Sequence, residues 1–150
     1  MIDKTIRSVA EAMAGIKDGS TVLIAGFAQV GEPRALIDGL IEQGARDLTV
    51  VHNTAGRGRE GVARLIGEGR VRKIVCSFAR SRGSVIFEEV FARGAIELEI
   101  VPQGTMAERM RAAAHDCFPR RHRRAHSPEN IDRKRPARLR CTNFVSICPT

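Results

Sequence analysis

The chain lacks tryptophan and tyrosine, and its six phenylalanines leave an aromatic content of only 4%. Proteins that bind single-stranded nucleic acid stack the bases on such side chains, so this composition argues against that class. The sequence also lacks an apolar run of the roughly 18 residues that a membrane-spanning helix needs. With 43% hydrophobic residues over 150 positions, the composition predicts a soluble globular protein with one core, and no association with a membrane.

Targeting and metal-binding signals are also missing. The first residues, MIDKTIRSVAE, have no apolar core like that of a signal peptide, and they contain acids that a transit peptide avoids. We therefore expect a cytoplasmic protein whose four cysteines stay reduced. No CxxC pair is present, and the Cys and His spacings match no familiar zinc finger, so no metal is expected.

Basic residues are distributed unevenly along the chain. Residues 1–113 hold 16 Lys and Arg against 14 Asp and Glu, a net charge of +2, whereas residues 114–150 hold 9 against 3, a net charge of +6. The second segment also holds four of the six prolines and three of the four histidines. We therefore divide the chain into an α/β domain at 1–113 and an Arg- and Pro-rich tail at 114–150, which has no regular apolar period and is expected to be disordered.

The stretch DGSTVLIAGFAQVGEP, from Asp18 to Pro33, has the pattern of a strand, a loop and a helix start. Its apolar block at 22–25 does not alternate, which is typical of a strand covered on both faces in a parallel sheet. Gly26 permits a turn, and Pro33 suits the first turn of a helix. Both the GxGxxG spacing and the Lys of a P-loop are absent. Glu32 would be stabilised as an anion at the helix start, so a neutral acyl or amide ligand fits better there than a phosphate.

Four strand and helix units of this kind follow a first helix. Apolar spacing predicts strands at 22–25, 48–51, 74–76 and 96–101, and helices near 6–13, 33–43, 59–66 and 84–92 and after residue 104. The last strand alternates apolar residues with Glu97 and Glu99, which predicts one wet face and a place near the edge of the sheet. Strands joined by single helices pair in parallel. The predicted fold is therefore α/β, a doubly wound and mostly parallel sheet with flanking helices.

Small and polar residues follow each predicted strand. They are Gly26-Phe27, His52-Asn53-Thr54, Ser77-Phe78 and Pro102-Gln103-Gly104. Because the carboxyl ends of parallel strands meet at one edge of a sheet, these residues predict a ligand site at that edge. Each also has a plain structural alternative: Asn53 could cap a turn, His52 could be a satisfied structural histidine, and Gln103 could be an exposed loop residue.

Several motifs, taken in order, resemble the A subunit of class I CoA-transferases over residues 1–113. They are the Asp18 to Pro33 stretch with its Gly26, Phe27 and Gly31, HNTAG at 52–56, VRKIVCSFAR at 71–80 and IELEIVPQGTMAERMRAAA at 96–114. The resemblance points in particular to subunits that act on 3-oxoacids. One departure is Thr54, where the family usually has a second Asn.

The resemblance implies an enzyme that moves CoA between succinyl-CoA and a 3-oxoacid, either 3-oxoadipate or acetoacetate. The family forms a covalent thioester on a glutamate of its B subunit, so no catalytic residue is expected in this chain. The CoA thioester is a substrate, and no permanently bound cofactor is implied. The chain would be inactive alone and would form a hetero-oligomer with the B subunit. Its implied share of the CoA and acyl pocket is Gly26, Phe27, Gly31, Asn53, Thr54, Gln103 and Gly104.

Other functions stay open at this point. A protein of the same broad fold could bind sugar phosphates, and the Arg-rich tail could bind nucleic acid or an acidic partner. The His and Cys residues of the tail could hold zinc. We favour a third explanation for the tail, a frameshift: residues 1–113 prefer Arg to Lys by 13 to 3, as a GC-rich coding sequence does, and out-of-frame reading of such a sequence yields Arg, Pro, Ala and His. The sheet would then be incomplete at the C-terminus, and the activity of the chain impaired.

Overall fold

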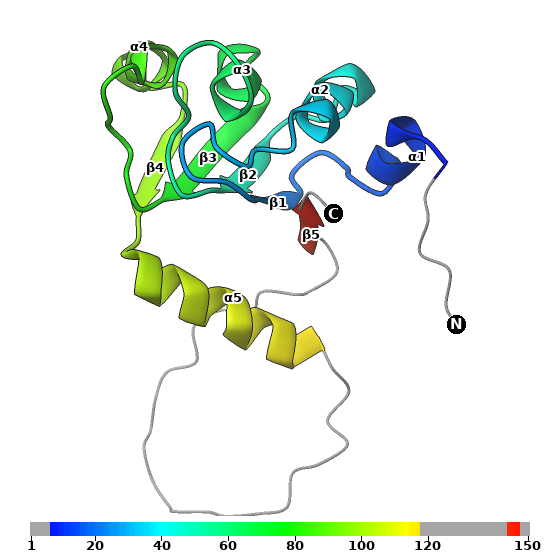
Figure 1. Cartoon of the computed structure of the whole chain (residues 1–150). Coiled ribbons are helices and arrows are strands. Elements are labelled where there is room, and N and C mark those ends of the chain that lie inside the picture. The colour runs from blue at the N-terminus through cyan, green and yellow to red at the C-terminus, as the bar shows by residue number, and fades with distance from the viewer. Residues whose placement is uncertain (1–6, 118–143, 148–150) are drawn as a thin grey trace, which may run out of the picture.

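The computed structural model of the chain describes residues 7–117 and 144–147, and its strands form one parallel sheet (Figure 1). The strands are β1 (Thr21–Ile24), β2 (Leu48–Val51), β3 (Val71–Cys76), β4 (Glu97–Ile100) and β5 (Phe144–Ile147). Their spatial order is β4-β3-β2-β1-β5, and every neighbouring pair is parallel. The predicted parallel α/β sheet is confirmed.

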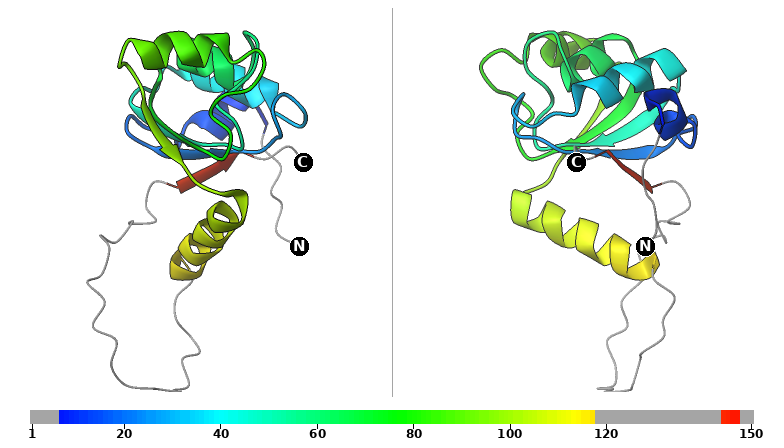
Figure 2. Two further views of the ribbon diagram at one scale, coloured as in Figure 1. Left: turned by 90° about the vertical axis from the view of Figure 1, so that its left-hand side faces the viewer. Right: turned by 45° about the vertical axis from the view of Figure 1, so that its right-hand side comes forward.

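Helices lie on both sides of this sheet. They are α1 (Val9–Met13), α2 (Arg34–Gln43), α3 (Val62–Gly67), α4 (Val85–Ala92) and α5 (Gln103–Cys117). Figures 1 and 2 show α2, α3 and α4 side by side on one face, with α1 beside α2, whereas α5 lies on the opposite side. None of the described helices combines the length and apolarity that crossing a lipid bilayer requires.

The hydrophobic core lies between the sheet and the row formed by α2, α3 and α4. Alternate strand residues point into it, among them Val22, Val50 and Ile74, whose side chains are fully buried. The expectation that β1 is covered on both faces is wrong, because its burial alternates and Leu23 is only half-buried. The physical reason is that α5 covers only part of the second face.

Glycine sets two features of the helical layer. Gly61 has a φ of +57°, which a helix does not accommodate, so α3 begins at Val62 and not near residue 59 as predicted. Gly39 lies in the middle of α2, where a Cβ would be 2.2 Å from Cγ1 of Val9. The missing side chain is therefore what lets α1 approach α2 closely.

Strand β4 forms one edge of the sheet, as its alternating sequence predicts. Glu97 and Glu99 both point to the wetter face, where Glu97 pairs with Arg72 at 3.1 Å and Glu99 pairs with Lys73 at 2.8 Å. At the other edge of the sheet, β5 pairs with β1. Residues 144–147 of the tail therefore form a strand, and α5 continues to Cys117, where disorder was expected. Residues 118–143 and 148–150 lie outside the described residues, so the division of the chain at residue 114 stays a prediction.

Candidate functional site

A pocket of about 360 Å³ opens at the carboxyl ends of β1 and β2, between the sheet and α5. Residues at the ends of the two strands form one wall, and Gln103, Met106 and Met110 of α5 form the other. Strand β1 has β2 on one side and β5 on the other, and ligands of open α/β sheets bind beside a strand where the order changes direction in this way. The pocket therefore lies where the topology favours a ligand.

Three of the predicted site residues, Gly26, Asn53 and Gln103, line this pocket. Gly26 has a φ of +128°, which side chains rarely permit, and the added Cβ would lie 3.2 Å from the carbonyl oxygen of Val30. Gln103 is the first residue of α5. The structure thus brings together residues from three separate predicted segments.

The other predicted site residues are not among those that line the pocket. Phe27 is 60% exposed and stands edge-on to Phe78, with ring centroids 6.5 Å apart. Gly31 and Gly104 are exposed as well. Thr54 is buried. Phe27 and Phe78 therefore contact each other at the surface, and Thr54 belongs to the interior.

Asn53 combines a fixed backbone with a side chain that lacks a partner. Its carbonyl oxygen accepts hydrogen bonds from the N–H groups of Ser77 and Phe78, each at 3.1 Å. Its side-chain Oδ1 is buried and has no hydrogen-bond partner among the described residues. A buried acceptor without a donor costs about 1–3 kcal/mol. A ligand that donates a hydrogen bond to Asn53 would offset that cost.

The turn into α5 is held by the end of β3. Ser77 Oγ donates a hydrogen bond to the carbonyl oxygen of Val101 at 2.8 Å, and the N–H of Val101 donates to the carbonyl oxygen of Cys76 at 2.9 Å. These two hydrogen bonds fix where Gln103 enters the pocket wall.

The Cys76 side chain takes no part in the pocket. Burial raises the pKa of its thiol to about 11, which fits inert packing in the core.

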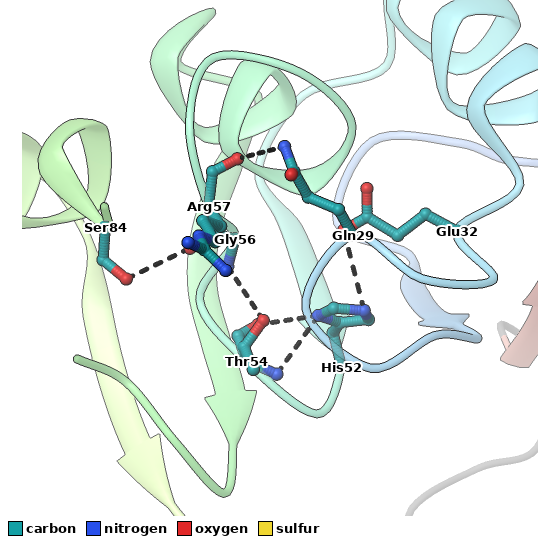
Figure 3. Close-up of polar contacts among 7 residues, drawn as sticks. All are labelled: Gln29, Glu32, His52, Thr54, Gly56, Arg57 and Ser84. Atoms are coloured by element: carbon teal, nitrogen blue, oxygen red, sulfur yellow. Dashed lines mark hydrogen bonds and ion pairs between the residues drawn. The ribbon is translucent and has the colours of Figure 1, made fainter. Parts of the chain in front are cut away.

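Glu32 differs most from its sequence-based interpretation. Its carboxylate was expected to be stabilised as an anion at the start of a helix, but its side chain is 1% exposed and lies 3.8 Å from Nε2 of His52, measured from Oε1 (Figure 3). Loss of solvent raises its pKa to about 7, although the backbone N–H of Val62 and the charge of Arg34 lower it. Burial therefore outweighs the helix terminus.

His52 is fully buried between Glu32 and Thr54. Its Nδ1 lies 2.7 Å from the carbonyl oxygen of Thr54, and burial lowers the pKa of the imidazole, so the ring is neutral near pH 7. Sequence reasoning named both Glu32 and His52 but did not predict that they meet. Twenty positions separate them, and the only signal was that each follows a strand of a parallel sheet.

Hydrogen bonds join the loops around this pair. Gln29 Nε2 donates to the carbonyl oxygen of Arg57 at 3.0 Å, which links the loop after β1 to the loop after β2 (Figure 3). Ser84 Oγ donates to the carbonyl oxygen of Gly56 at 3.2 Å, which links the second loop to the start of α4. Within residues 7–117 and 144–147, no group of three or more side chains is arranged to hold a metal ion.

The fold and the pocket define an α/β protein with a pocket at the carboxyl edge of a parallel sheet, beside the strand where the order changes direction, which is where proteins of this class bind ligands. Within that class, the chain belongs to the coenzyme A transferase family, whose model matches residues 6–118. The resemblance carried by the sequence motifs is therefore confirmed.

Relatives of known name agree with this assignment. The chain is 55% identical over 113 residues to the A subunit of the 3-oxoadipate CoA-transferase of Pseudomonas putida, covering 75% of this chain and 49% of the relative. It is 52% identical over 119 residues to the protein of the same name from Acinetobacter baylyi, covering 79% and 52%. The chain thus spans about half the length of these curated relatives.

A solved structure supports the fold. The acyl-CoA transferase from E. coli O157:H7, determined as a thioester complex with CoA, superposes with a TM-score of 0.60 at 27% identity. The match covers 72% of this chain and 22% of that chain.

Proposed function

We propose that this chain is the A subunit of a CoA-transferase that moves CoA between succinyl-CoA and a 3-oxoacid, either 3-oxoadipate or acetoacetate. The observation that carries the proposal is the identity of 55% and 52% to two relatives named as the A subunit of 3-oxoadipate CoA-transferase. That name also supports a hetero-oligomer in which the partner is a B subunit. The nucleophilic glutamate would then belong to the B subunit, and none of the residues of this chain would react covalently.

The proposed reaction consists of two exchanges at a carbonyl group. The B subunit's glutamate attacks the thioester carbonyl, the C–S bond breaks, and CoA leaves as a thiolate. The thiolate then attacks the glutamyl carbonyl of the mixed anhydride, which releases the first acid as a carboxylate and leaves CoA as a thioester on the glutamate. The acceptor acid reverses both steps, so that atoms and charge balance over the cycle.

The part played by this chain follows from its pocket. The side-chain amides of Asn53 and Gln103 come from opposite walls, and an amide N–H can donate to a carbonyl oxygen that gains negative charge during the attack. Met106 and Met110 supply apolar surface that keeps water from the activated acyl group. We assign this chain binding, orientation and water exclusion around a nucleophile that its partner provides.

The tail bears on whether this chain is active. We propose that a frameshift near residue 114 replaced the second half of the protein and that activity is impaired; the family match, which ends at residue 118, supports this. Sequencing of the locus tests the idea, because a frameshift predicts that family sequence continues in another reading frame. Absence of such sequence would overturn it.

The function itself is tested by co-expression with a B subunit of the family. Transfer of CoA from succinyl-CoA to 3-oxoadipate or acetoacetate is measured for the mixture and for each of the two proteins by itself. Activity only in the mixture supports the proposed role and shows that the tail is tolerated. A complex that assembles but is inactive supports the same role with impairment. Activity of this chain alone, or failure of the two soluble proteins to assemble, would contradict the proposal.

A further inference from the structure

Glu32 and His52 form a buried polar pair that the proposed reaction does not use. The distance between Oε1 of Glu32 and Nε2 of His52 is 3.8 Å, and the two side chains are 1% and 0% exposed. Neither carboxyl oxygen of Glu32 nor Nε2 of His52 has a hydrogen-bond partner among the described residues. The 3.8 Å between them is longer than a hydrogen bond, and the backbone N–H of Val62 also acts on the Glu32 carboxylate. Because buried polar groups without partners are costly, both side chains gain if they close to hydrogen-bond distance of each other.

The hydrogen-bond geometry of His52 indicates where the shared proton lies. Nδ1 lies 2.7 Å from the carbonyl oxygen of Thr54, and the N–H of Thr54 also points at Nδ1, at 3.2 Å. The contact with the oxygen is the shorter of the two and is favourable only when Nδ1 carries a hydrogen, so it favours the tautomer in which Nδ1 donates to Thr54. In a neutral ring, Nε2 is then an acceptor and requires a donor. The facing group is the Glu32 carboxyl, which can donate only when it is protonated.

Burial, acting against most of the surrounding polar and charged groups, favours the neutral form of the pair. Arg34 at the start of α2 and Glu60 before α3 form an exposed salt bridge of 2.7 Å and act in opposite directions on the pKa of Glu32, which burial raises to about 7. The backbone N–H of Val62, at the start of α3, lowers that pKa. Burial also lowers the pKa of His52. A carboxylic acid facing a neutral imidazole is consistent with both shifts.

Glu32 also lies between two segments that line the pocket, the one that contains Gly26 and the one that contains His52 and Asn53. A Cβ added to Gly26 would lie 3.1 Å from its Cγ, and a Cβ added to Gly61 would lie 1.8 Å from its Oε2. The side chain thus packs between the end of β1 and the start of α3 and reaches His52, the residue before Asn53.

We propose that Glu32 is a positioning residue, which as a neutral carboxylic acid shares its proton with His52 and thereby fixes Gly26 and Asn53 relative to each other in the pocket wall. The proton sharing is a property of this chain alone. Only its effect on turnover rests on the function proposed above. The two parts of the proposal therefore have separate tests.

The first test is nuclear magnetic resonance of the histidine rings in the full chain. His52 is the only histidine before residue 115, so the three histidines at 115, 122 and 126 serve as internal references, and His52→Asn identifies its signal. We expect the His52 ring to be neutral near pH 6.5, with the proton on Nδ1, because Glu32, whose pKa is about 7, still carries the proton that it donates to Nε2. Glu32→Gln should preserve this state, because its amide can donate to Nε2. Glu32→Leu should shift the backbone amide signal of Asn53.

Two results would overturn the proposal. A His52 ring that is doubly protonated near pH 7 would mean an ion pair instead of a neutral pair. Unchanged Asn53 signals in Glu32→Leu would mean that the pair does not position the pocket. Asp38→Asn is the matched control, because it breaks a 2.7 Å bridge from α2 to Arg64 of α3 without touching Glu32 or His52. If Glu32→Leu does not fold, Glu32→Asp, whose carboxyl is one methylene too short, replaces it.

The second test uses the complex with the B subunit. We expect Glu32→Gln to keep kcat/KM within about threefold and Glu32→Leu to lower it about tenfold or more, chiefly through kcat, because misplaced groups lose transition-state contacts. Equal losses in both variants would contradict a role for the shared proton. If the wild-type chain and the B subunit do not assemble, the proposed function fails, whereas the histidine signals still decide the proton sharing.

Discussion

The two faces of the sheet are covered very differently. The face beneath α2, α3 and α4 is closed, and its residues, such as Val50, are fully buried. The opposite face is closed only in part by α5, so that Val51 is half-buried and lines the pocket. Val50 and Val51, which are consecutive in β2, therefore have different roles: the first packs in the core, and the second faces the pocket.

The largest expected effect compares these two neighbours directly. Val50→Ala should lower the free energy of unfolding by about 2–3 kcal/mol, because it removes two buried methyl groups and leaves a cavity. Val51→Ala removes the same atoms from the half-covered face and should cost about 1 kcal/mol or less. Urea denaturation of both variants measures the difference. Equal costs would show that the two faces do not differ in this way.

The next comparison is between Asn53 and Thr54 at the pocket edge. Asn53→Ala should lower kcat/KM of the complex with the B subunit by about 10- to 100-fold and leave stability nearly unchanged, because its side-chain oxygen has no partner among the described residues. Thr54→Val should instead cost about 1 kcal/mol of stability, since its hydroxyl accepts a hydrogen bond from the N–H of Gly56. Steady-state kinetics and urea denaturation of both variants test this, and the reverse pattern would contradict it.

Glu32→Gln should change how stability depends on pH. The folded-state pKa of Glu32 is about 7 and its ordinary value is 4.5, so the folded chain retains a proton that the unfolded chain has lost between these values. Its stabilising contribution is full below 4.5 and is lost as the pH rises to about 7. The variant should therefore match the wild type near pH 4.5 and exceed its stability at pH 8 by on the order of 2 kcal/mol.

The contribution of His52 to stability has the opposite pH dependence, and His52 is present in both the wild type and the Glu32→Gln variant. Its pKa is lowered, so its contribution is full above 6.5 and declines as the pH falls. The difference between wild type and Glu32→Gln thus isolates Glu32. Urea denaturation at pH 4.5, 6 and 8 measures it, and a difference that is constant over this range would rule out a titrating Glu32.

The smallest expected effect concerns the charges that link α5 to the wetter face. Glu99 accepts hydrogen bonds from Lys73 and Arg109, which lower its pKa, so its contribution is present above pH 4.5 and is lost as the pH falls through the folded-state value. Glu99→Gln should cost about 0.5–1 kcal/mol at low ionic strength and almost nothing in 1 M salt. Glu97→Gln, which removes a single exposed pair, is the control, and salt-independent costs would contradict this account.

Local sequence patterns predicted the features of the fold that depend on neighbours along the chain. The apolar blocks and their spacing gave the parallel sheet, and the alternation around Glu97 and Glu99 placed β4 at the edge. The half-exposed side of β1 could not be predicted in this way, because it depends on how much of the sheet α5 covers. The start of α3 at Val62 depended on the backbone conformation of a single glycine, Gly61.

In the candidate site, too, some features could be predicted from the sequence and others depended on tertiary packing. Topology alone predicted that Gly26, Asn53 and Gln103 gather at one edge, because parallel strands end on the same side. The contact between Glu32 and His52 depended on tertiary packing and was missed. A carboxylate next to a helix start is ordinarily an anion, and only the surrounding walls show that this one has lost its solvent.

The close approach of α1 to α2 also governs the order in which substitutions can accumulate. Alanine at position 39 should favour the helical state of α2 by about 1 kcal/mol over glycine. Its methyl group would lie 2.2 Å from Cγ1 of Val9, so Gly39→Ala is unfavourable while that valine is present. After Val9→Ala the same change becomes favourable. Whether Gly39→Ala stabilises or destabilises the protein thus depends on the residue at position 9. An evolving or engineered lineage must therefore change position 9 before position 39.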